Sequence, residues 1–109
     1  MSTLLDYQIA AKEFAKYPKE HALYYTTLGL CGEAGEVANK VKKIYRDKGG
    51  VLSQEDKKNI SLELGDVLWY ISDLAGQLGY RLDEIAYQNI AKLDVRRGNN
   101  TINGAGDNR

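Results

Sequence analysis

Two pairs of carboxylates in this sequence have the spacing and the surroundings of metal ligands. Glu33 and Glu36 stand three positions apart, as do Glu63 and Asp66. On a helix this spacing puts both side chains of a pair on one face, one turn apart. Each pair borders an apolar stripe, where four carboxylates repel one another unless a cation neutralises them. Carboxylate oxygens favour Mg²⁺, with Mn²⁺ as a substitute. We therefore predict a divalent cation site formed by these four residues.

Glycines near both pairs strengthen this prediction. Gly29, Gly32 and Gly35 recur every three positions, and Gly65 lies between Glu63 and Asp66. In a helix interior each costs about 1 kcal/mol relative to alanine, so we expect close approach of a second helix or of a ligand. Either acidic pair alone would suit an ordinary solvated helix. Di-iron bundles need a Glu-x-x-His motif, and the single His21 lies in neither pair.

The pattern of apolar residues and breakers predicts the helices that position these carboxylates. Apolar residues recur at steps of three and four, which predicts an all-α fold with four helices. Nothing in the sequence indicates a strand. We expect one domain over residues 1–98 and a Gly/Asn-rich tail over 99–109 that orders over a pocket when nucleotide binds. The first helix should be capped by Thr3 or Asp6 and end before Pro18, and the second should run over about 21–45. The third should start at a Ser53–Asp56 capping box and stop at Gly79. The fourth should start at Asp83 and end near Gly98.

If the two long helices pack antiparallel, the acidic pairs meet near the middle of each helix. The 26 residues between Glu36 and Glu63 fit this arrangement, because they supply about two and a half turns, a short loop and a similar return. Lys40 and Tyr70 then lie in the same rows as the carboxylates. On the last helix, Asn89, Lys92 and Arg96 share one face, which suits phosphate contacts or an ordinary solvated surface.

Composition limits the classes of partner. The chain has 109 residues with 15 Lys and Arg against 15 Asp and Glu, so no overall field favours a nucleic-acid polymer or a membrane surface. No apolar run has membrane-spanning length. The single Cys31 excludes an intramolecular disulfide and suits a reducing compartment, and we expect it to be a small core residue. A cytoplasmic protein is expected.

Several segments together resemble one enzyme family. They read GLCGEAGEVANKVKK over 29–43, ELGDVLWYISDLA over 63–75 and NIAKLDVRR over 89–97. Glu-x-x-Glu followed some two dozen residues later by Glu-x-x-Asp is similar to the motif of the MazG-type all-α nucleoside triphosphate pyrophosphohydrolases. The ending GAGDNR resembles the tails of small phage and bacterial members. The resemblance covers nearly the whole chain from Tyr7 onward.

This resemblance implies an activity and a set of roles. Glu33, Glu36, Glu63 and Asp66 would bind Mg²⁺, which holds the triphosphate of a (d)NTP while water attacks the α-phosphorus to give a (d)NMP and pyrophosphate. Lys40, Asn89, Lys92 and Arg96 would contact phosphates, and Tyr70 would contact the base or sugar. The fold would be a four-to-five-helix bundle whose core is completed in a homodimer or homotetramer. The alternatives are a dimeric dUTPase-like enzyme of the same superfamily and a non-catalytic helical dimerisation or nucleotide-binding module.

Overall fold

The structure is a computed structural model, and it describes residues 3–99 as an all-α chain without strands in that range. None of the helices in this range is long and apolar enough to cross a membrane. The predicted tail lies outside the described residues apart from Asn99. The elements are α1 (Leu4–Lys12), a single 3₁₀ turn η1 (Lys19–His21), α2 (Ala22–Lys48), α3 (Gln54–Gln77) and α4 (Leu82–Gly98).

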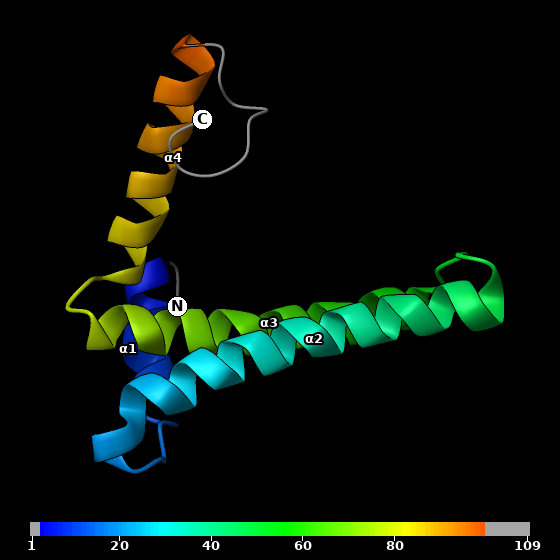
Figure 1. Ribbon diagram of the computed structural model, residues 1–109, viewed down its shortest axis with the longest axis horizontal. Coiled ribbons are helices and arrows are strands. Elements are labelled where there is room, and N and C mark those ends of the chain that lie inside the picture. Colours follow the sequence, from blue (N-terminus) through cyan, green and yellow to red (C-terminus); the bar gives the residue numbers. More distant parts are fainter. Residues whose placement is uncertain (1–2, 100–109) are drawn as a thin grey trace.

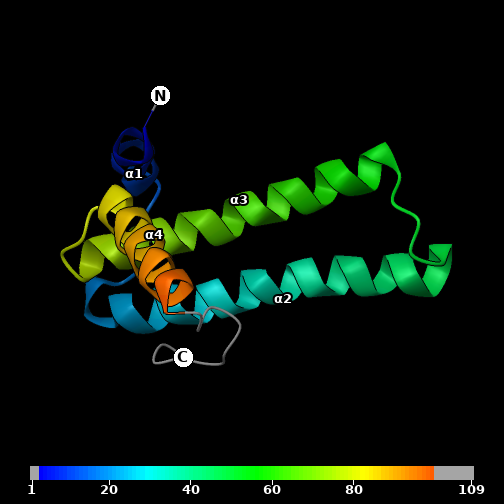
Figure 2. The ribbon, with the colours of Figure 1, turned by 90° about the horizontal axis from the view of Figure 1, so that it is seen from above.

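The two longest helices, α2 and α3, form an antiparallel hairpin that dominates the molecule (Figures 1 and 2). The helix α2 extends three residues beyond the predicted end, because it stops at Gly49, the first residue that takes a left-handed conformation (φ 61°). The predicted capping box starts α3: Asp56 N donates to Ser53 Oγ at 3.1 Å, and Ser53 N donates to Asp56 Oδ2 at 3.0 Å. Both predicted long helices and their antiparallel packing are thus confirmed.

The shorter helices gather at one end of the hairpin. Thr3 caps α1 by accepting from Asp6 N at 3.0 Å. The indole Nε1 of Trp69 donates to Ala11 O at 3.0 Å, so Trp69 joins α1 to α3. Helix α3 ends before Gly79, which has a φ of 83°, and α4 then rises away from the hairpin (Figure 1).

The described chain buries few large apolar side chains. Its buried apolar residues are Ala11, Ile44, Ala75 and Leu82. The radius of gyration is 16.7 Å, against about 13 Å for a globular domain of this length. Cys31 is exposed, which corrects its prediction as a core residue. In the described range α2 packs on α3 and η1 alone, which leaves the Cys31 side chain uncovered.

Candidate functional site

Three of the four predicted metal ligands converge in the middle of the hairpin. Glu33 from α2 and Glu63 and Asp66 from α3 each place one carboxylate oxygen within 4.8 Å of the others. We call these three residues the carboxylate cluster. Glu33 and Glu63 are half-buried, whereas Asp66 is exposed. The antiparallel packing of α2 on α3 brings the two acidic pairs to the same level.

The carboxylate cluster carries more negative charge than its surroundings neutralise. The pKa of Glu33 is raised from its ordinary value of 4.5, first by burial and then by the charges of Asp66, Glu63 and Glu36. The ammonium of Lys40 lies 3.7 Å from Glu63 Oε1. Each of the three residues therefore offers one carboxylate oxygen to a cation placed between them, and oxygen is the ligand atom that Mg²⁺ prefers. The donor set is therefore suited to a hard divalent metal.

Glu36 lies outside this group of three. It is exposed and stands one turn beyond Glu33 on α2. Its charge still contributes to the raised pKa of Glu33. The structure thus gathers three of the four predicted ligands around one point and leaves the fourth carboxylate beside them.

Tyr70 lies one turn from Asp66 and packs across the hairpin onto α2. A Cβ added to Gly29 would lie 2.1 Å from Tyr70 Cε1, so the ring fills the space left by that glycine. The ring also contacts Tyr25, with centroids 6.2 Å apart. Burial and a hydrogen bond with Tyr25 raise the pKa of the Tyr70 hydroxyl. Close helix approach therefore explains Gly29, while Gly32, Gly35 and Gly65 have no neighbour within 4 Å of an added Cβ.

A second polar group beside Tyr70 is absent from the sequence prediction. The ring of Tyr17 stacks on Tyr25 at 4.8 Å, and its hydroxyl donates to Asp73 Oδ2. Gln77 Nε2 donates to Tyr17 Oη at 3.2 Å and to Thr26 Oγ1 at 3.0 Å. Burial and the Asp73 carboxylate raise the pKa of Tyr17 to about 12. Only the position of Asp73 in the row of Asp66 and Tyr70 hinted at this group, since Tyr17 comes from the loop after α1.

A cavity of about 420 Å³ opens beside these residues, between α1 and the end of α3. Tyr17, Asp73 and Gln77 line one part of it, and Gln8, Lys12 and Tyr80 line another. The tip of the hairpin is the loop between α2 and α3. The cavity lies further from this tip than the carboxylate cluster does, whereas Lys40 and Lys43 lie between the cluster and the tip. The carboxylate cluster therefore has an aromatic side and a basic side.

The three predicted phosphate contacts on α4 are not gathered with the others. Asn89 and Lys92 are exposed and Arg96 is buried. In the described range, α4 packs on α1 and α3 and makes no contact with α2. The helix leads away from the hairpin (Figure 1). Lys40 and Tyr70 are thus the predicted contacts that the chain itself places beside the cluster.

Comparison with known proteins gives the family. Residues 23–100 match the model of the MazG nucleotide pyrophosphohydrolase domain. The chain is 50% identical over 109 residues to the Gene 37 protein of Mycobacterium phage L5, covering 94% of this chain and 96% of that protein. No solved structure matches significantly. The matched range contains both acidic pairs and the tyrosine and lysine beside them, and the chain belongs to the MazG nucleotide pyrophosphohydrolase family.

Proposed function

We propose that this chain is a Mg²⁺-dependent pyrophosphohydrolase that converts a (d)NTP to the (d)NMP and pyrophosphate. The observation that carries the proposal is the convergence of Glu33, Glu63 and Asp66 from two helices onto one point. Family membership supports pyrophosphohydrolysis as the reaction class. Mn²⁺ offers the same preference for oxygen ligands and is the expected substitute.

Different residues of the chain take the roles of metal ligand and proton acceptor in the proposed reaction. The carboxylate cluster would hold the cation, which when bound neutralises phosphate charge and lowers the pKa of a coordinated water. Glu36 remains beside the cluster with an exposed carboxylate, so we assign to it the acceptance of the water proton. Water oxygen bonds to the α-phosphorus, the bond from that phosphorus to the bridging oxygen breaks, and pyrophosphate leaves.

The two sides of the cluster orient the substrate. Lys40 and Lys43 lie toward the hairpin tip and suit the β- and γ-phosphates. Tyr70, Tyr25 and Tyr17 lie on the other side and suit the sugar and base. The nucleotide would therefore lie along the hairpin, with its α-phosphate at the cluster.

The protein is proposed to act as a homodimer or homotetramer. Several large apolar side chains of the hairpin are exposed, among them Leu23, Leu64 and Leu78. Large apolar side chains exposed along a helix are typical of an interface with a second copy. The large radius of gyration is consistent with a chain that completes its core against a second copy.

A product assay tests this function. The protein is incubated with each (d)NTP, with and without Mg²⁺, and the products are separated. We expect a monophosphate and pyrophosphate only with Mg²⁺. Glu36→Ala and Asp66→Ala should abolish turnover with helical content unchanged, whereas Glu55→Gln, an exposed carboxylate in the first turn of α3, should not. Near-normal turnover by Glu36→Ala would contradict the assignment, and binding without turnover would favour the non-catalytic alternative.

A further inference from the structure

One face of α3 carries a row of polar residues that begins at the carboxylate cluster and ends in the cavity. Asp66, Tyr70, Asp73 and Gln77 follow one another at steps of four, three and four, so they share one face of the helix. Asp66 belongs to the cluster, and Asp73 and Gln77 line the cavity. Asp73 lies seven residues after Asp66, which is about 10 Å along the helix axis. This distance is of the order of that between the α-phosphate of a nucleotide and the far edge of its base.

A network of hydrogen bonds fixes the orientation of the Gln77 side chain. Its Nε2 donates to Thr26 Oγ1 at 3.0 Å, to Tyr17 Oη at 3.2 Å and to Asp73 Oδ2 at 3.4 Å. The hydroxyl of the fully buried Thr26 donates to Ala22 O at 2.9 Å, and the Tyr17 hydroxyl donates to Asp73. Both hydroxyl oxygens therefore act as acceptors toward Gln77. Because every partner is an acceptor, the amide nitrogen must face the network and the amide oxygen must face away from it.

Two oxygens at this network are available to a ligand. Both hydrogen bonds to Asp73 reach Oδ2, and Oδ1 accepts from no group within residues 3–99. In the same part of the chain, Gln77 Oε1 accepts from no group either. The two side chains lie one turn apart on the same face of α3 and contact each other. Asp73 Oδ1 and Gln77 Oε1 thus form a pair of neighbouring acceptors, which we call the acceptor pair.

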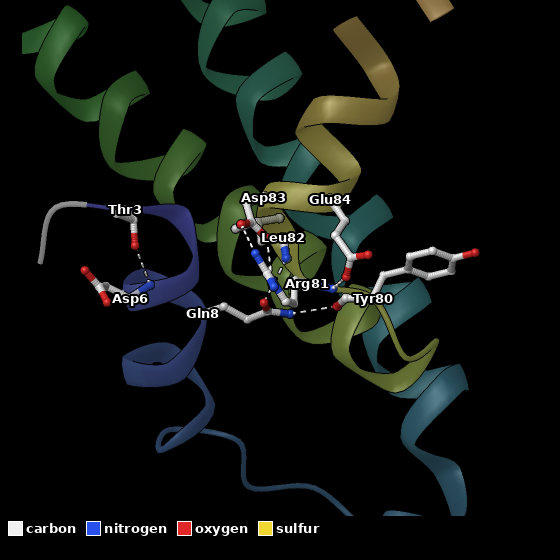
Figure 3. A network of polar contacts seen from close by, with 8 residues as sticks. All are labelled: Thr3, Asp6, Gln8, Tyr80, Arg81, Leu82, Asp83 and Glu84. Atoms are coloured by element: carbon white, nitrogen blue, oxygen red, sulfur yellow. Dashed lines mark hydrogen bonds and ion pairs between the residues drawn. The ribbon is translucent and has the colours of Figure 1, made fainter. Parts of the chain in front are cut away.

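Another part of the cavity wall comes from Gln8 of α1. Its side-chain amide donates to Ser72 O at 3.2 Å and to Tyr80 O at 3.1 Å, and it accepts from Leu82 N at 2.8 Å (Figure 3). Both amide hydrogens are therefore used within the protein. Gln8 holds α1 against the end of α3 and so maintains the shape of the cavity, but it has no amide hydrogen left for a ligand.

We infer that Asp73 and Gln77 select a base that carries an exocyclic amino group. Such a nitrogen has two hydrogens, and each oxygen of the acceptor pair can accept one of them. Uracil and thymine carry a carbonyl oxygen in place of the amino group of cytosine, and that oxygen would face two acceptors. Their single N3–H lies between two carbonyl oxygens and can satisfy one acceptor at most.

The expected substrate is therefore a (d)NTP of cytosine, adenine or guanine rather than of uracil or thymine. This inference rests on the proposed function, because an α-phosphate held at the carboxylate cluster is what directs the base toward the cavity.

The nucleotides dCTP and dUTP test this selection, because they have the same size and differ at the base edge that the acceptor pair would contact. We expect kcat/KM to be about tenfold higher for dCTP, the order of discrimination that a matched pair of hydrogen bonds gives. Equal values, or a preference for dUTP, would overturn the inference and leave the proposed function intact.

Asp73→Asn tests the role of the carboxylate. Tyr17 and Gln77 both donate to Asp73, so they should retain the carbonyl oxygen of the new side chain and place its NH₂ group where Oδ1 was. A donor at this position fits the carbonyl oxygen of uracil, so the ratio of kcat/KM for dCTP over dUTP should fall to one or below. Glu55→Gln removes one negative charge from the first turn of the same helix and should keep the wild-type ratio. An unchanged ratio in folded Asp73→Asn would overturn the inference.

Fluorescence of Trp69 measures base selection without turnover. Trp69 is the single tryptophan of the chain, and its ring contacts Tyr70 with centroids 5.0 Å apart. The protein is titrated with dCMP and with dUMP in the presence of Mg²⁺, since these monophosphates are products and undergo no further hydrolysis. We expect tighter binding of dCMP by the wild type and no such difference in Asp73→Asn. Equal binding by the wild type would contradict the inference, whereas selective binding by a protein that hydrolyses no nucleotide would support it and refute the proposed function.

Discussion

The ring of Tyr70 occupies the space that any side chain at Gly29 would need, since an added Cβ would lie 2.1 Å from Tyr70 Cε1. The same tyrosine stands one turn from Asp66, so the packing of the hairpin and the wall of the candidate site share one residue. A change that moves this ring should therefore affect both stability and substrate binding.

Gly29→Ala is expected to lower stability by about 1 to 3 kcal/mol, the usual cost of overpacking, and to raise KM by displacing Tyr70. Gly65→Ala is the matched control, because an added Cβ there meets nothing within 4 Å. That control should gain up to about 1 kcal/mol from helix propensity. Thermal unfolding of both variants measures the difference, and equal stabilisation by both would show that Tyr70 does not fill the space at Gly29.

Glu33→Gln should stabilise the metal-free protein at neutral pH. The folded-state pKa of Glu33 is raised above 4.5 by burial and by the neighbouring carboxylates, so the ionised form is disfavoured in the folded chain. Wild-type stability therefore falls as pH rises from 4.5 through the folded pKa, and the gain from the substitution appears over that window. Melting temperatures in chelator at several pH values measure this gain.

Added Mg²⁺ supplies the control for the same substitution. The cation should raise the melting temperature of the wild type strongly and that of Glu33→Gln weakly, because binding to the folded state stabilises it. A variant that is destabilised at neutral pH without metal, or that responds to Mg²⁺ like the wild type, would exclude Glu33 from the site.

Tyr17→Phe should remove a tyrosine whose hydroxyl loses its proton only at unusually high pH. Its pKa is raised to about 12, so the hydroxyl keeps its proton and donates to Asp73 at all working pH values. Folding favours the protonated phenol, and wild-type stability should fall as pH rises from 10 toward 12. Ultraviolet titration of tyrosinate should show one fewer late-ionising group in the variant, with KM raised more than kcat is lowered. Loss of a group that titrates near the ordinary tyrosine pKa of 10 instead would contradict the Tyr17–Asp73 contact.

The sequence predicted the helices because their signals are local. The steps of three and four residues between Leu64, Val67 and Ile71, the Ser53–Asp56 box and Gly79 each act within a few residues, and the structure contains the elements they predict. The convergence of Glu33 with Glu63 and Asp66 was predicted as well, because two antiparallel helices of the expected lengths place the acidic pairs opposite each other near the middle of the hairpin.

The remaining features depend on contacts between distant segments. Tyr17 reaches Asp73 from 56 residues away, and Gln8 binds Leu82 from 74 residues away. No local pattern encodes either contact. The exposure of Cys31 likewise depends on what packs over α2, which periodicity alone does not reveal. Contacts of this kind decide the direction in which α4 leaves the hairpin.

Hydrolysis in ¹⁸O-labelled water tests the central claim most directly. Attack at the α-phosphorus, beside Glu33, Glu63 and Asp66, places the labelled oxygen in the nucleoside monophosphate and leaves pyrophosphate unlabelled. Mass spectrometry of the products after a single turnover reads this position. We predict label in the monophosphate alone. Label in orthophosphate, with a nucleoside diphosphate as the second product, would contradict the account.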